Sequence, residues 1–289
     1  MLWIYLALTA YFVNAIAFVI DKHLLSSSLP RPFAYAFGVS ILSILAVVLI
    51  PFGVAWLGVQ YFFISFVSGT AFFIALFFLY KSIKLSDVSV ASINVATLSA
   101  IFTYVLSVFI LKEKLGTNNG LAFVFLVLGI LFLGMIRRDI FRYSILAGLF
   151  FGLSLVLLKW TFNYSDFVNG IFWTRIGFVG SSLFMLVFPR ARGEISNSLK
   201  NAPQSSLFLF ILNKIIAGVG FLTLYYAIQL GNVSLVNALL GVQFSFVFIL
   251  ALIFGKIFPD VAENITRKIL IKKLLGISFI GVGFLMLFR

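Results

Sequence analysis

Long apolar segments separated by short polar ones make up almost the whole chain. A helix that crosses a lipid bilayer needs about 20 mostly apolar residues, and segments of this kind recur from one end of the sequence to the other. The pattern predicts ten spanning helices, at Leu2–Ile20, Phe33–Ile50, Tyr61–Tyr80, Val88–Leu111, Leu121–Ile136, Tyr143–Trp160, Phe167–Phe188, Leu207–Ile228, Val233–Phe254 and Leu274–Phe288.

Two polar stretches are long enough to predict substantial loops. The first is Arg190–Ser206, which follows a proline and is rich in serine. The second is Lys256–Lys273, which fits either an amphipathic helix on the membrane surface or a basic extension of the last span.

One unit of the apolar pattern occurs twice. Tyr80–Leu115 and Tyr225–Phe258 each hold a short polar hinge followed by a long apolar segment. The two segments align without gaps at a separation of 145 positions, so that Tyr80 meets Tyr225. A unit that recurs in this way indicates a duplicated membrane protein.

The duplication divides the ten spans into five plus five. The division predicts a first repeat at residues 1–138 and a second at residues 139–289. Because five is an odd number, the second repeat enters the membrane in the opposite orientation. The predicted fold class is therefore an all-α integral membrane protein with ten transmembrane helices in two inverted five-helix repeats.

Composition excludes an ordinary soluble domain and narrows the chemistry. The chain is 63% hydrophobic and 10% charged, whereas soluble chains are about a quarter charged. It has no Cys and a single His, His23, which removes thiolate nucleophiles and most metal-binding arrangements. There is no phosphate-binding P-loop. We therefore expect no enzyme activity, no metal and no cofactor.

The basic residues favour a lipid partner over a nucleic acid, although the net charge is +13. They lie in short loops, where they set the topology and meet anionic lipid. One set of alternate loops holds most of them, and the sparse set holds Lys112, Lys114, Lys159 and Arg289. The bias predicts that both termini lie outside the cytoplasm.

The hinge before the fourth and ninth spans and the run LKEKLGTNNGLAFVFLVLGILFL resemble the EamA-type transporters of the drug/metabolite transporter superfamily. In that family an acidic residue and a Gly-containing segment follow the fourth helix of a repeat, and Glu113 and Gly116–Gly129 take those places. Arg175, in WTRIGFVGSSLF, matches an arginine often found in the second helix. The resemblance implies membrane transport of a small-molecule substrate.

The chain also departs from the family pattern. The proline usual within the fourth helix is missing near Leu98 and again near Gln243, and Lys256 stands near the place of the second acid. Family members are usually drawn with both termini in the cytoplasm, which is opposite to the orientation that the loop charges predict.

Arg175 and Lys214 are the candidates for an anion-binding site, because both lie deep within predicted spans. A charge at that depth costs roughly 2.5–3.5 kcal/mol on insertion scales unless it meets a partner or water. No carboxylate lies within a predicted span, so internal neutralisation is not expected. The alternatives are that each cation snorkels or pairs with backbone carbonyls or with an acid from another helix.

Six further side chains are candidates for a central substrate cavity. They are Asn94, Asn237, Gln243, Tyr80, Tyr225 and Trp173. A site at the interface of two repeats recruits such groups from both halves. Hydrogen bonding between helices needs the same amides, and Trp173 also fits an aromatic belt at the membrane interface, so the structural alternatives stay open.

The two acids nearest the spans are expected to lie at helix ends. Asp21 beside Lys22 reads as an interfacial pair, and Glu113 reads as paired with Lys112 or Lys114 rather than as a proton carrier. Gly148 and Gly152 form a GxxxG spacing that predicts close packing with the first span.

These features together predict a multi-pass protein of the plasma membrane. Its expected function is secondary transport of a small metabolite, anionic or zwitterionic, by alternating access. Two alternatives are a flippase for a lipid-linked substrate and a membrane scaffold that transports nothing.

Overall fold

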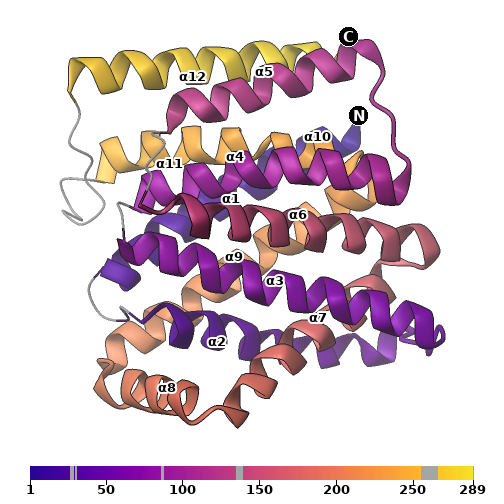
Figure 1. The fold of residues 1–289 in the computed structure, drawn as a ribbon, viewed down its shortest axis with the longest axis vertical. Coiled ribbons are helices and arrows are strands. Elements are labelled where there is room, and N and C mark those ends of the chain that lie inside the picture. Colours follow the sequence, from indigo (N-terminus) through magenta and orange to yellow (C-terminus); the bar gives the residue numbers. More distant parts are fainter. Residues whose placement is uncertain (27–28, 30, 86–87, 135–138, 255–265, 289) are drawn as a thin grey trace.

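The computed structural model describes residues 1–26, 29, 31–85, 88–134, 139–254 and 266–288, and these residues form helices with no strand among them (Figure 1). In chain order the α-helices are α1 (Leu2–Ser26), α2 (Pro32–Leu42), α3 (Val59–Leu85), α4 (Val88–Leu106), α5 (Thr117–Leu133), α6 (Phe141–Tyr164), α7 (Phe167–Phe184), α8 (Pro189–Asn201), α9 (Gln204–Leu230), α10 (Val233–Ala238), α11 (Leu240–Phe254) and α12 (Arg267–Met286). Tighter or wider turns extend three of them, namely the 3-10 helices Ser43–Phe52 after α2 and Met185–Val187 after α7, and the π-helical turn Ser107–Leu111 after α4.

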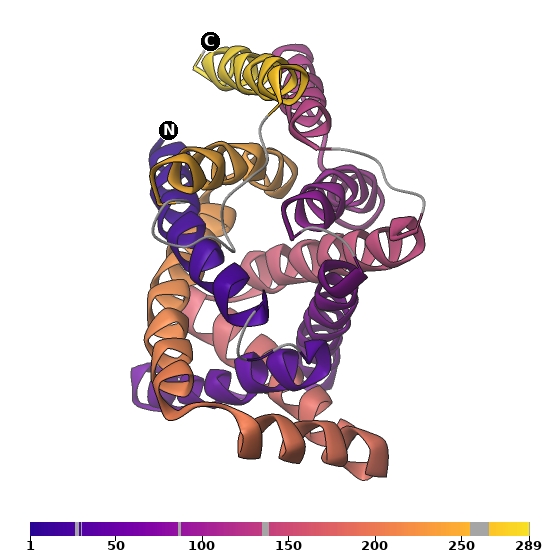
Figure 2. The same cartoon turned by 90° about the vertical axis from the view of Figure 1, so that its left-hand side faces the viewer.

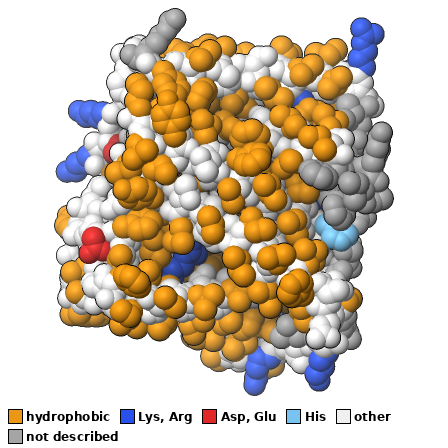
Figure 3. Space-filling model, turned by 180° about the vertical axis from the view of Figure 1, so that it is seen from behind, with side chains coloured by type: hydrophobic (Ala, Val, Ile, Leu, Met, Phe, Trp, Pro, Cys, Tyr) orange, Lys and Arg blue, Asp and Glu red, His pale blue; other side chains and the backbone are white. Residues whose placement is uncertain are grey.

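Nine helical stretches of the described residues are long and apolar enough to cross a bilayer, and α5 is apolar but has only 17 residues. Much of the outer surface is hydrophobic, with charged side chains mainly at its margins (Figure 3). A soluble protein rarely exposes so large an apolar surface, whereas lipid covers it in a membrane. The chain is a multi-pass integral membrane protein.

The helices stack along the long axis of the molecule. Figures 1 and 2 show α5 and α12 together at one end and α8 at the other. Between them, α1 packs against α9, while α3 packs against both α6 and α7. The predicted contact between the GxxxG of α6 and the first span is wrong, because Gly148 and Gly152 instead face the backbone of α4 near Ser99 and Thr103.

Two helix boundaries differ from the prediction in ways that matter for the site. α1 continues past Ile20 to Ser26, so that Asp21 lies inside the helix. α12 begins at Arg267 instead of Leu274, which confirms the basic extension of the last span for that part of the second loop. Residues 255–265 lie outside the described part of the chain.

The prediction of a loop at Arg190–Ser206 is wrong, because most of this polar stretch forms α8. Pro189 occupies the first turn of this helix, where a fixed φ and a missing N–H cost nothing. Ile195 is buried, and the Arg31 guanidinium donates to the Glu194 carbonyl at 3.3 Å. These contacts hold α8 against α2.

α3 and α7 approach each other closely because both have glycine at the crossing. A Cβ atom at Gly69 would lie 2.1 Å from the Thr174 carbonyl oxygen and 2.3 Å from the Phe178 nitrogen. A Cβ atom at Gly177 would lie 2.5 Å from the Phe66 carbonyl oxygen. Both obstacles are backbone atoms, so no side-chain rotation relieves them.

We expect Gly69→Ala to separate α3 from α7 and to destabilise the protein by about 1–3 kcal/mol, the usual cost of overpacking. The matched control is Gly218→Ala, because a Cβ atom at Gly218 of α9 has nothing within 4 Å and alanine favours a helix by up to ~1 kcal/mol. The thermal midpoint of purified protein measures both changes. Equal midpoints for the two variants would contradict the close crossing.

Candidate functional site

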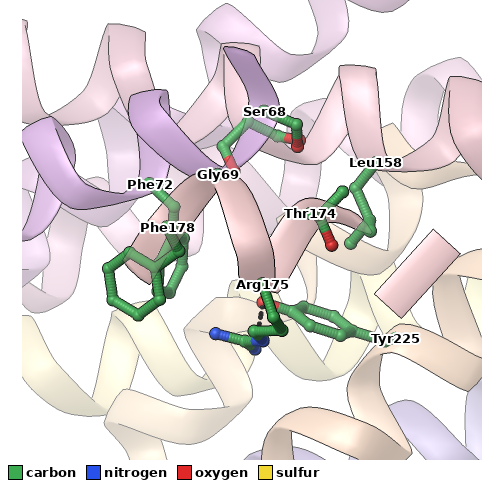
Figure 4. A pocket seen from close by; sticks show the side chains of 9 residues that line it. Ser68, Gly69, Phe72, Leu158, Thr174, Arg175, Phe178 and Tyr225 are labelled. Carbon is green, nitrogen blue, oxygen red and sulfur yellow. Dashed lines mark hydrogen bonds between the residues drawn. The ribbon is translucent and has the colours of Figure 1, made fainter. Parts of the chain in front are cut away.

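A cavity lies where α3, α6, α7 and α9 meet. Its lining consists of Ser68, Gly69, Phe72, Ser154, Leu158, Thr174, Arg175, Phe178 and Tyr225. Arg175 stands eight residues into α7, which places it roughly 12 Å from the start of the helix. In Figure 4 the two phenylalanines lie together on one side of the arginine, and Thr174 and Leu158 lie on the other.

The guanidinium of Arg175 is held by neutral groups. Its Nη2 donates to the Tyr225 hydroxyl at 2.8 Å, and its Cζ lies 5.1 Å from the centroid of the Tyr225 ring (Figure 4). The Phe72 and Phe178 rings lie 5.6 Å away. Among the described residues, no carboxylate lies within 4.0 Å of this cation.

These contacts leave most of the binding capacity of the guanidinium unused. An arginine has five N–H donors, and Tyr225 is its hydrogen-bond partner among the described residues. The cavity measures about 10 Å³, which is room for about one water molecule. The site therefore holds a positive charge with no negative partner among the residues that the structure describes, and it has no room for anything larger than a water molecule.

A second cluster surrounds Lys214 on α9. Its Nζ lies 2.6 Å from Oδ1 and 2.8 Å from Oδ2 of Asp21 on α1. The expectation that no carboxylate lies inside a span is therefore wrong, because Asp21 lies within α1 and pairs with Lys214. The reason is that α1 runs on past its apolar stretch and carries Asp21 into the bundle.

Neutral donors complete the coordination of the Asp21 carboxylate. The Asn213 amide donates to Oδ1 at 2.5 Å and to the Ala17 carbonyl at 3.1 Å, and the Tyr35 hydroxyl donates to the same carboxylate. Tyr80 contributes its ring, whose centroid lies 5.1 Å from that of Tyr35.

Comparison with known proteins finds a family that the first part of the chain resembles. Residues 1–135 match the family model described as "EamA-like transporter family". Through this segment, which is slightly less than half of the chain, the protein is similar to the EamA-like transporter family. The family is part of the drug/metabolite transporter superfamily, and its members are membrane transporters rather than enzymes.

One similar solved structure extends the likeness beyond the matched segment. It is described only as "Crystal structure of protein" and has 16% sequence identity and a TM-score of 0.65, over 99% of this chain and 95% of the other. At that identity the likeness shows the fold alone. No curated protein matches the sequence.

The acid expected after the fourth helix of an EamA repeat, Glu113, does not form the predicted helix-end pair. Its Oε2 accepts a hydrogen bond from the Asn232 amide at 2.8 Å. Burial raises the pKa of this carboxyl, and the nearby Lys159 ammonium and the Asn232 hydrogen bond oppose that rise. Asn232 also caps the start of α10, through hydrogen bonds from the backbone nitrogens of Ser234 and Leu235.

Lys159 is a buried helix cap and not the loop cation that the sequence predicted. Its Nζ donates to the carbonyls of Ile228, Gln229 and Gly231 at 2.9, 2.9 and 2.8 Å. These carbonyls lie at the end of α9, where a helix leaves carbonyl groups unsatisfied and carries partial negative charge. Once Lys159 is removed from the sparse set of loops, that set holds even fewer basic residues than the sequence predicted.

The remaining predicted site residues lie away from the Arg175 cavity. The Asn237 amide donates to Ser99 and Thr103 at 3.0 and 2.8 Å, which joins α10 to α4. Asn94 and Gln243 are buried on α4 and α11. The structure thus brings Arg175 together with Tyr225 and Lys214 together with Tyr80, and the three amides lie on other elements.

Trp173 fixes the loop before α3 to α7. Its Nε1 donates to the Ala55 carbonyl at 3.1 Å, and its ring lies 5.4 Å from that of Trp56 and 5.5 Å from that of Phe62. It does not line the described cavity. These contacts agree with the alternative prediction for Trp173, a place in the aromatic belt at the membrane interface.

The candidate site residues from the sequence did not include Asp21, Tyr35, Asn213 and Ser68, although Asn213 is one of the few polar residues within the predicted spans. A signal existed for two of them. The repeat spacing of 145 places Asn213 and Lys214 opposite Ser68 and Gly69, which line the Arg175 cavity. No comparable signal pointed to Asp21 and Tyr35, because their proximity depends on how α1 and α2 are placed in the folded chain.

We expect Lys159→Met to lower the thermal midpoint of the purified protein by several degrees, because three carbonyls at the end of α9 lose their partner and each unsatisfied buried group costs about 1–3 kcal/mol. Lys268→Met removes the same charge from an exposed position on α12 and serves as the control. If both variants melt like the wild type, the cap contributes nothing to stability.

Proposed function

We propose that this protein is a secondary transporter that moves a small anionic or zwitterionic metabolite across a membrane by alternating access. The observation that carries this proposal is the Arg175 guanidinium, which lies beside a cavity inside the bundle and has no carboxylate partner among the described residues.

The contacts of Arg175 support an anion as its ligand. Exposure of this cation to lipid would cost roughly 2.5–3.5 kcal/mol, and each aromatic ring offsets about 0.5–2 kcal/mol of that cost. The charge is therefore tolerated without being neutralised. A carboxylate or phosphate oxygen arriving in the cavity would form charge-assisted, bidentate hydrogen bonds with the unused donors. Tyr225 would orient the guanidinium toward it.

Helix boundaries support the two inverted repeats that alternating access requires. α3 runs from Val59 to Leu85 and α9 runs from Gln204 to Leu230, so each helix has 27 residues. The first residues of the two helices are 145 positions apart, and so are their last residues. α4 and α10 begin at Val88 and Val233, again 145 apart. This agreement supports repeats at residues 1–138 and 139–289, with α5 as one of ten membrane helices.

The size of the cavity supports a closed conformation of the transport cycle. Pockets for small molecules measure about 300–1,000 Å³, whereas this cavity is about 10 Å³. The helices around Arg175 must therefore separate before a metabolite enters. We place the protein in the plasma membrane, with the lipid bilayer and a small-molecule substrate as its partners.

Counterflow in liposomes tests the proposal with a panel of carboxylates, phosphates, zwitterions and neutral solutes. We expect transport of at least one anion, and we expect Arg175→Gln to lower its rate at least tenfold because the charge is lost. Arg175→Lys retains the charge but not the bidentate geometry, so its transport rate should lie between those of the wild type and Arg175→Gln.

Arg142→Gln is the matched control, since Arg142 is an exposed arginine at the start of α6. If Arg175→Gln transports every accepted anion at the wild-type rate, the anion site is wrongly assigned. Flipping of a lipid-linked substrate in place of metabolite transport would instead favour a flippase, and transport of neither would favour a scaffold.

A further inference from the structure

The Asp21–Lys214 cluster and the Arg175 cavity occupy equivalent places in the two proposed repeats. The spacing of 145 pairs Gly69 with Lys214 and Tyr80 with Tyr225. In each pair one residue belongs to the cavity and the other to the cluster. Lys214 and Tyr225 are eleven residues apart on α9, so the two sites lie about 16 Å apart along this helix.

One hydrogen bond recurs in both halves and fixes the equivalence of α1 and α6. Ser68 of α3 donates to the Ser154 carbonyl of α6 at 2.8 Å. Asn213, its counterpart on α9, donates to the Ala17 carbonyl of α1 at 3.1 Å. Counting four residues onward from each acceptor gives Leu158 of the cavity lining and Asp21 of the cluster. Asp21 therefore stands where the other half has an apolar side chain.

The donors around Asp21 form the kind of set that binds a free carboxylate. They comprise one ammonium, one amide and one hydroxyl, from Lys214, Asn213 and Tyr35, and all three converge on the two oxygens of a single carboxylate. A buried ion pair alone gives little net stability, because desolvation of both charges offsets their attraction. Stability is therefore a weak reason for a charge pair at this place.

We infer that Lys214, Asn213 and Tyr35 form a second carboxylate-binding site, which the protein's own Asp21 occupies in this conformation. The inference rests on the proposed function, since the two sites then mark successive positions of an anion between α3 and α9. A substrate carboxylate that leaves Arg175 would exchange with Asp21 for the Lys214 ammonium. Asp21 keeps the second site neutral whenever substrate is absent.

The test is whether an added carboxylate replaces the missing one in Asp21→Ala. The thermal midpoint of the purified variant is measured in sodium acetate and in sodium chloride, at equal ionic strength and neutral pH. We expect acetate to raise the midpoint of Asp21→Ala by roughly 2–4 °C more than it raises the wild type, because acetate binds only the folded variant.

Two controls separate this site from other effects of acetate. Asp21→Ala combined with Lys214→Met retains the Arg175 cavity but lacks the second cation, and it should respond like the wild type. Leu24→Ala removes a buried apolar side chain one turn further along α1, so it reports general destabilisation. An equal acetate response in Asp21→Ala and in the double variant would overturn the inference.

Asp21→Ser leaves room for acetate beside a small polar side chain and serves if Asp21→Ala does not fold. Acetate should then stabilise Asp21→Ser more than it stabilises the wild type, and an equal response would overturn the inference. The proposed function fails separately. If Arg175→Gln transports normally while acetate still restores Asp21→Ala, the second site stands and the assignment of Arg175 as the anion site falls.

Discussion

A charged group inside a lipid bilayer has no water to solvate it, so the protein itself must supply its partner. Three of the basic side chains, Lys159, Lys214 and Arg175, meet this constraint in three ways. Lys159 binds the free carbonyls at the end of α9, and Lys214 binds the Asp21 carboxylate. Arg175 has aromatic rings and a phenol instead. The first two solutions satisfy the charge completely. The third stabilises the cation but uses few of its N–H donors, and this difference is the basis of the functional proposal.

The same position of the proposed repeat serves two purposes. In the first half it holds Gly69, which lets α3 touch the backbone of α7. In the second half it holds Lys214, whose side chain extends toward Asp21 on α1. One half is therefore closed by backbone packing, and the other is joined by a pair of opposite charges. Packed glycines separate only if whole helices move, whereas an ion pair can exchange partners. The two halves thus combine a similar scaffold with different chemistry.

Much of the fold could be predicted from the sequence, because lipid-facing helices can be recognised by their length and apolar composition. The family resemblance and the paired Tyr80 and Tyr225 also followed from local pattern. Features set by tertiary contacts could not be read in this way. Asp21 looked interfacial because the apolar run ends at Ile20, yet α1 continues to Ser26. Lys159 looked like a loop charge because its three carbonyl partners lie about 70 residues away. The polar α8 was missed because its sequence lacks the apolar length of a span, although packing against α2 makes it helical.

Direct titration of an accepted anion into purified protein measures whether Arg175 is a binding group, independently of the transport cycle. Wild-type protein and Arg175→Gln are compared by calorimetry in the same detergent and salt. The wild type should bind the anion with a measurable Kd, and Arg175→Gln should bind it at least tenfold more weakly, which corresponds to about 1.4 kcal/mol. Equal affinities of the two proteins would contradict the assignment of the Arg175 guanidinium as the anion site.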